Sequence, residues 1–272
     1  MRSNFSFCAA LTPLICGFLC GWLAKTLTVH SSAVSNVVLG NVSFFEKQAK
    51  NVVTEAPKLQ PSQSQGYYLH PPMTRNQIGK MLEEMGLKIG AELGVQAGDF
   101  AETTLNQWQS CQKYYLIDIW QPLKNYKDSA NQNQKAQDSR MNAAKSRLAK
   151  WRDKTVFYRM LTKDAVKKFS NNSLDYIYVD ARHDYCAAKE DIELYWPKLR
   201  PGGVMAGHDY VTNEEAKKHS QDWGLCEDGS RVEGAVKQAV DEFVKKEQLV
   251  VGVTYRESWA NSWMVRKPLK SF

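Results

Sequence analysis

Short apolar runs alternate with segments of helical periodicity along the chain after Pro72. The apolar runs predict strands over residues 89–93, 114–119, 156–160, 174–180, 204–207, 249–255 and 262–265. Helical patterns cover residues 74–85, 100–108, 137–151, 163–169, 186–196 and 234–246, and Thr74 is the expected N-cap of the first. Alternation of this kind is typical of an α/β fold with a doubly wound sheet. Because no helical pattern separates the last two runs, we expect them to pair as an antiparallel hairpin.

The N-terminal part of the chain has a different pattern. Residues 5–23 carry no charge, and a stretch of this length is just long enough to span a bilayer as a helix. We therefore divide the chain into a signal-anchor or transmembrane segment at 1–30, a stem or linker rich in Ser, Gln, Asn and Pro at 31–72, and a folded domain at 73–272. A signal peptide cleaved near Ser31-Ser32-Ala33 and a buried core helix are the alternatives.

This organisation predicts a single-pass membrane protein of the secretory pathway, in the Golgi or endoplasmic reticulum, with a lumenal domain. The alternative is a protein secreted after signal cleavage. Two short glycosylation sequons, at Asn41-Val42-Ser43 and Asn171-Asn172-Ser173, agree weakly with a lumenal domain. The charges that flank the apolar segment, Arg2 and Lys25, are too few to fix its orientation.

Composition narrows the classes of partner and site. The net charge is +7, but the basic residues are scattered among acidic ones, so we expect no nucleic-acid partner. Outside the apolar segment only Cys111, Cys186 and Cys226 remain, which allows at most one intrachain disulfide. No CxxC pair is present, so a zinc–cysteine site is not expected.

Candidate ligand-binding residues follow the first two predicted strands. Glu92 and Gly94 end the first strand, and Gly98 opens the next helix, whose N-terminal amides favour negative charge. The second strand ends in Asp118, about 20 residues after the glycine loop, where an acidic side chain suits ribose hydroxyls. Trp120 is expected either to lie on an adenine ring or to pack in the core. Together these residues indicate an adenosine-containing cofactor.

A third cluster follows the central strands. Asp180-Ala181-Arg182-His183-Asp184-Tyr185 precedes a helical pattern, Leu199-Arg200-Pro201-Gly202-Gly203-Val204 opens the next strand, and Gly207-His208-Asp209-Tyr210 ends it. With the E-x-G-x-x-x-G loop, these motifs resemble class I S-adenosylmethionine (SAM) methyltransferases, in particular methyltransferase domain family 24, over roughly residues 75–266. The resemblance implies a Rossmann-like fold with a C-terminal hairpin. It also implies that Glu92, Gly94 and Gly98 surround the methionine part of SAM while Asp118 holds its ribose.

Asp180, His208 and Asp209 end adjacent predicted strands, so we expect them to converge as ligands of a divalent metal, Mg²⁺ or Mn²⁺. Such an ion lowers the pKa of a substrate hydroxyl, and His183 is the candidate general base. Each residue also has a structural alternative: Asp180 as a helix cap and His183 as a buried structural histidine. His208 stands where many relatives carry an acidic residue, which leaves the identity and occupancy of the metal open.

The sequence therefore predicts a SAM-dependent methyltransferase, with metal-assisted O-methylation of a hydroxylated small molecule or sugar as the expected reaction. The alternatives are metal-independent methyl transfer and a membrane-tethered, catalytically inactive binding protein. The segments 121–140 and 212–231 are the candidate walls of the substrate site, and nothing in the sequence indicates the oligomeric state.

Overall fold

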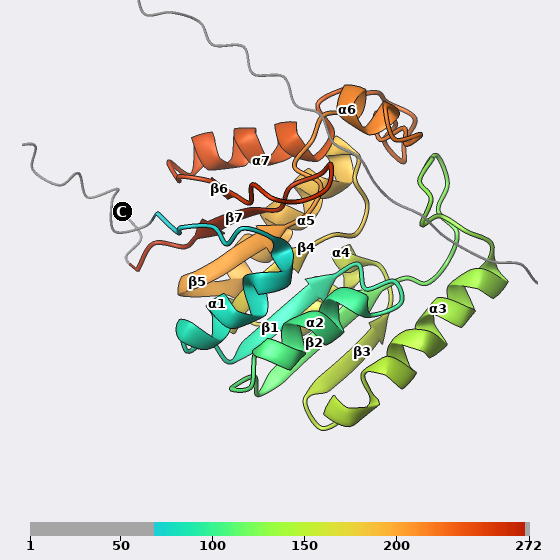
Figure 1. The fold of residues 1–272 in the computed structure, drawn as a ribbon. Helices are drawn as coiled ribbons and strands as arrows, with labels where there is room; N and C mark the ends of the chain where they lie inside the picture. Colours follow the sequence, from blue (N-terminus) through green and yellow to red (C-terminus); the bar gives the residue numbers. More distant parts are fainter. Residues whose placement is uncertain (1–67, 270–272) are drawn as a thin grey trace, which may run out of the picture. The chain divides into compact units, whose positions relative to one another are not determined.

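The computed structural model describes residues 68–269, which form a seven-stranded sheet in the order β3-β2-β1-β4-β5-β7-β6 (Figure 1). The strands are β1 (Ile89–Leu93), β2 (Lys113–Asp118), β3 (Thr155–Arg159), β4 (Leu174–Val179), β5 (Leu199–Gly207), β6 (Gly252–Val253) and β7 (Trp263–Arg266). Strands β1 to β5 are parallel, whereas β7 pairs antiparallel with both β5 and β6. The predicted α/β class, doubly wound sheet and C-terminal hairpin are confirmed.

Helices cover both faces of the sheet, because side chains alternate along each strand and both faces are apolar. One face packs against α1 (Ile78–Glu84), α2 (Asp99–Gln107) and α3 (Gln134–Arg147). The other packs against α4 (Thr162–Ala165), α5 (Tyr185–Tyr195) and α7 (Ala235–Lys246) (Figure 1). The short helix α6 (Asn213–Lys217) belongs to the segment between β5 and α7.

Several predicted element boundaries differ from the observed ones. The chain after Thr74 first makes a 3-10 turn, η2 (Arg75–Gln77), and the Thr74 side chain caps no helix. Helix α3 starts three residues before its predicted start, because the Asn133 side chain accepts a hydrogen bond from the amide of Ala136. The predicted strand 249–255 contains only the two-residue β6.

The predicted anchor at 1–30 lies outside the described residues, as does the linker as far as residue 67. Residues 68–72, the end of that linker, have no regular secondary structure. Between residues 68 and 269 we find no helix with the length and apolar character needed to cross a membrane.

One disulfide joins Cys186 in α5 to Cys226 in the segment between β5 and α7. Cys111 is buried and unpaired with another cysteine. This arrangement agrees with the prediction of at most one intrachain bridge among these three cysteines.

Candidate active site

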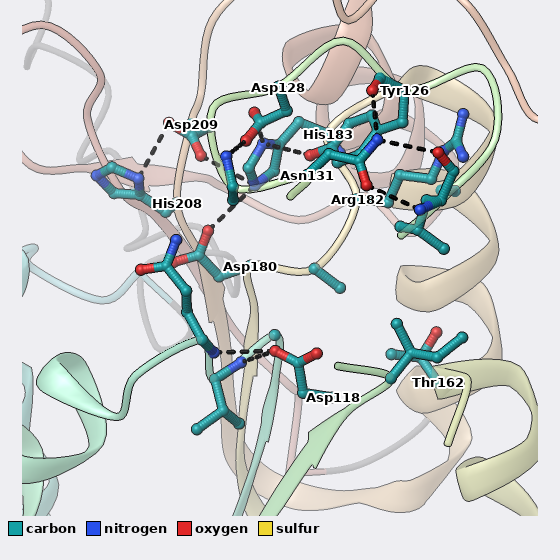
Figure 2. A pocket seen from close by; sticks show the side chains of 18 of the residues that line it. Asp118, Tyr126, Asp128, Asn131, Thr162, Asp180, Arg182, His183, His208 and Asp209 are labelled. Carbon is teal, nitrogen blue, oxygen red and sulfur yellow. Dashed lines mark hydrogen bonds and ion pairs between the residues drawn. The ribbon is translucent and has the colours of Figure 1, made fainter. Parts of the chain in front are cut away.

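A cavity of about 350 Å³ opens at the carboxyl ends of the parallel strands, and all the predicted site residues except Gly98 and Trp120 line it (Figure 2). Glu92 lines it from β1 and Asp118 from β2, while Asp180 and His208 directly follow β4 and β5. Since parallel strands present their carboxyl ends at one edge, this is where the fold is expected to bind ligands.

The turn after β1 requires glycine at its first position. Gly94 has φ +88°, and a Cβ atom there would lie 1.9 Å from the carbonyl oxygen of Asp180. The absence of a side chain therefore lets the end of β1 approach the end of β4. Gly98, the N-cap of α2, also has a positive φ, but it packs against Ala144 and does not line the cavity.

The Asp118 carboxylate ties the end of β2 to the glycine loop. Its Oδ2 accepts hydrogen bonds from the amides of Val95 and Gln96, each at 2.9 Å, and its Oδ1 accepts one from the amide of Trp120 at 2.8 Å. Asp118 still lines the cavity (Figure 2), so it both shapes the loop and faces the space predicted for the ribose.

Trp120 does not lie where we predicted an adenine contact. Its side chain is fully buried, packs in the core with its ring centre 6.1 Å from that of Phe157, and donates from Nε1 to the carbonyl oxygen of Gln96. The left-handed turn at this residue, with φ +44°, is part of the local path that buries the ring. The structure thus supports the core alternative for Trp120.

Glu92 is a buried carboxyl group in the cavity wall, with only 1% of its surface exposed. It accepts a hydrogen bond of 2.6 Å from the hydroxyl of Tyr114. Burial raises the pKa of Glu92 to about 8, although the bond from Tyr114 opposes the shift. The group therefore holds its proton at neutral pH.

Asp180, His208 and Asp209 converge in the wall of the same cavity (Figure 2). One potential ligand atom from each lies within 4.8 Å of the others. Two carboxylates and an imidazole are suitable ligands for a divalent transition metal such as Mn²⁺, so the donor set fits the predicted ion. Burial opposes the charged form of Asp209, but the neighbouring His183 and His208 outweigh it and lower its pKa to about 2.

The His183 ring lies between two pairs of polar side chains. Its Nε2 is 3.3 Å from Asp180 Oδ1 and 3.2 Å from Asp209 Oδ2. Its Nδ1 is 2.9 Å from the hydroxyl of Tyr126 and 3.3 Å from Asp128 Oδ2. Burial disfavours the imidazolium, yet the nearby carboxylates outweigh it and raise the pKa of His183 well above its usual value. The ring is therefore held in place as a proton carrier.

Arg75 is a site residue that the sequence did not reveal. It comes from η2, and its Nη1 lies 3.3 Å from Asp180 Oδ2 while its guanidinium carbon lies 5.6 Å from the centre of the Phe100 ring. The contact joins residues 105 positions apart, and no local pattern marks it. Arg75 places a permanent positive charge beside the predicted metal ligands.

Both predicted wall segments, 121–140 and 212–231, line the cavity, and Tyr126 and Trp223 belong to its lining. The Nε1 of Trp223 donates to Asp128 Oδ2 at 2.7 Å, which joins the two segments over His183. Arg182 is buried beneath them and donates to the carbonyl oxygens of Lys124, Asn125 and Leu225. The sequence indicated the walls but not this buried arginine that holds them.

Comparison with known proteins agrees with this geometry. Residues 91–210 match the model of a family described as a methyltransferase domain. No curated protein matches the chain significantly.

The fold is also similar to solved structures of low sequence identity. The O-methyltransferase from Bacillus cereus in complex with S-adenosylhomocysteine (SAH) is 15% identical, with 85% of this chain and 94% of that chain covered and a TM-score of 0.49. The N-methyltransferase NodS from Bradyrhizobium japonicum WM9 in complex with SAH is 14% identical, with 71% and 86% covered and a TM-score of 0.47. Residues 91–210 of the chain are therefore similar to a family of methyltransferase domains.

Proposed function

We propose that the protein transfers the methyl group of SAM to a hydroxyl oxygen of a small molecule or sugar, with assistance from a divalent metal. The observation that carries this proposal is the convergence of Asp180, His183, His208 and Asp209 in the same cavity as the glycine loop. Glu92, Gly94 and Asp118 line the same cavity and would hold the cofactor, which would supply the methyl group.

The protein's own residues supply the proton transfer. Because the pKa of His183 is raised, its neutral form must act as the base: an acceptor hydroxyl beside the neutral ring gives its proton to Nε2 while its oxygen bonds to the methyl carbon. The bond between that carbon and sulfur breaks, its electron pair goes to sulfur, and SAH leaves. Tyr126 and Asp128 hold the ring from the Nδ1 side, so Nε2 stays directed at the carboxylates of Asp180 and Asp209, beside which the acceptor would bind.

Asp180 and Asp209 would hold the metal through carboxylate oxygens, and His208 through its imidazole. A divalent ion bound there supplies positive charge that lowers the pKa of the acceptor hydroxyl. One observation favours a metal-independent alternative: Arg75 already provides a cation 3.3 Å from Asp180. In that alternative His183 and Arg75 alone orient and deprotonate the acceptor.

The first test is calorimetric titration of the purified full chain with SAH, with and without Mn²⁺, and with Mn²⁺ alone. We expect SAH to bind, and Mn²⁺ binding to be lost in Asp180→Asn and Asp209→Asn. The matched control is Asp153→Asn, because the Asp153 side chain is 94% exposed and lies outside the cavity.

The outcomes separate the alternatives. SAH binding without Mn²⁺ binding supports the metal-independent reaction. Failure to bind SAH under every metal condition overturns the enzymatic proposal and supports a catalytically inactive binding protein.

We also propose that the domain resides in the lumen of the secretory pathway, tethered by the N-terminal segment or secreted after its cleavage. The disulfide between Cys186 and Cys226 supports an oxidising compartment, because such bonds are rare in the cytosol.

A further inference from the structure

A row of three aromatic rings, those of His183, Trp223 and Trp259, leads from the proposed base to the protein surface. The centre of the His183 ring lies 4.5 Å from that of Trp223, and the centre of the Trp223 ring lies 5.7 Å from that of Trp259. Trp223 is 2% exposed, whereas Trp259 is 37% exposed. All three side chains line the cavity, so the aromatic row forms a wall between the reacting groups and the open end of the cavity.

The ring of Trp259 is held in place before any ligand binds. It belongs to the loop between β6 and β7, in which the amides of Tyr255 and Arg256 donate to the carbonyl oxygen of Met73 at 3.2 and 3.0 Å. The Trp259 ring also stacks on the ring of His219 from the second wall segment, with centres 4.3 Å apart and planes 24° apart. A surface that is already ordered binds a ligand with little further loss of conformational entropy.

Polar side chains line the same cavity as this exposed indole. They come from both wall segments and include Gln121, Ser129, Gln221 and Glu227. An aromatic face packs against apolar surface, while amide, hydroxyl and carboxylate groups exchange hydrogen bonds with a polar ligand. A saccharide ring is complementary to both, because its C–H groups form an apolar face and its hydroxyl groups lie around the edge.

The aromatic row also separates Trp259 from the reacting hydroxyl, since Trp223 stands between Trp259 and His183 in the chain of ring contacts. A saccharide ring with its hydroxyl beside His183 therefore leaves Trp259 to the next ring of the ligand. We propose that the acceptor is a glycoside of at least two saccharide rings, and that Trp259 is a specificity residue that stacks on the ring next to the methylated one. The inference rests on the proposed methyl transfer and names its substrate class.

The test compares disaccharides with their parent monosaccharides as methyl acceptors for the full chain, with SAM and with or without Mn²⁺. The probes are glucose with maltose and cellobiose, galactose with lactose, N-acetylglucosamine with chitobiose, and mannose with mannobiose. Mass spectrometry of the methylated products gives kcat/KM for each probe. In at least one pair, we expect kcat/KM for the disaccharide to exceed that for the monosaccharide by about tenfold, as the contact of a ring with an aromatic face allows.

Trp259→Ala should reduce this ratio to near one, whereas Trp259→Phe should retain most of it because phenylalanine keeps an aromatic face. A loss of activity caused by displacement of Trp223 would lower transfer to both members of a pair and leave their ratio unchanged. Tyr255→Ala is the matched control and should keep the wild-type ratio, because Tyr255 lies in the same loop and is 63% exposed but does not line the cavity. If Trp259→Ala does not fold, Trp259→Leu replaces it.

A wild-type ratio in a folded Trp259→Ala or Trp259→Leu variant overturns the role of Trp259. If a chain that binds SAH methylates none of the saccharide probes, the saccharide assignment is overturned, and methylation of catechol in the same assay would leave the proposed methyl transfer intact. Failure of the wild-type protein to bind SAH overturns the proposed function itself. The two failures are therefore distinguishable.

Discussion

Glu92 is a residue whose burial changes how stability depends on pH. Its pKa is about 8 in the folded protein and near 4.5 in an unfolded chain. Between these values the folded state binds more protons, so the stabilisation is complete below about pH 4.5 and is lost as pH rises through 8. The free energy of unfolding of the wild-type protein should therefore fall between pH 5 and pH 9. We predict that this fall is smaller by a few kcal/mol in Glu92→Gln.

Thermal unfolding of both proteins at several pH values in this range measures the effect. The pKa of Asp191 is also raised, to about 7, so this residue lowers the stability of both proteins as pH rises. Some dependence of stability on pH therefore remains in Glu92→Gln. Equal slopes in wild type and Glu92→Gln would contradict the prediction.

Whether a residue's place in the site could be predicted from the sequence depends on whether the residue follows a strand. The convergence of Asp180, His208 and Asp209 could be expected, because each follows a recognisable apolar run and adjacent parallel strands end at one edge. Arg75 and Arg182 could not be predicted, since their partners depend on how a 3-10 turn and two long segments fold back. Trp120 shows a related limit, because the turn that buries its ring depends on local backbone angles.

At the scale of elements, the contact between the ends of β1 and β4 depends on Gly94. We predict that Gly94→Ala destabilises the fold by several kcal/mol and abolishes SAH binding, because its Cβ would lie 1.9 Å from the Asp180 carbonyl oxygen. Chemical denaturation and calorimetry measure the two effects.

Gly86→Ala is the matched control for this prediction. Gly86 also has a positive φ, +65°, but no other atom lies within 4 Å of the added Cβ. The control should therefore lose only about 1 kcal/mol, the usual effect of left-handed strain. Equal losses in the two variants would show that backbone strain, rather than the contact with β4, determines the role of Gly94.

Elements were predictable where their apolar pattern was long. The central strands and α5 and α7 lie close to their predicted positions, because burial on both faces of the sheet imposes strong patterns. The segment predicted as a helix over 163–169 instead divides into the one-turn α4 and a 3-10 turn, Val166–Lys168. Such a short segment is governed by its packing against the sheet, which the sequence does not display.

For the whole molecule, a lumenal location predicts glycosylation at Asn171. This side chain is exposed in the turn that precedes β4, whereas Asp180 and the cavity lie at the opposite end of that strand. A glycan there would not obstruct the site. We predict that the full chain, expressed in animal cells, shows a glycosidase-sensitive mobility that Asn171→Gln reduces.

Asn172→Gln is the control, because it changes the adjacent residue and leaves the Asn171 sequon intact. The other sequon, at Asn41, can give a second shift that the Asn171 variant retains. A chain whose mobility does not respond to glycosidase would count against the lumenal location.

The disulfide also determines what proteolysis can separate. Cys186 and Cys226 close a covalent ring that contains β5, His208 and Asp209, while Asp180 precedes the ring. Lys217 and Lys218, which are exposed, lie inside it. A chain cleaved after Lys218 would therefore consist of two polypeptides that stay covalently joined and migrate as one molecule until the disulfide is reduced. Asp180 and Asp209 would both lie on the first of these polypeptides.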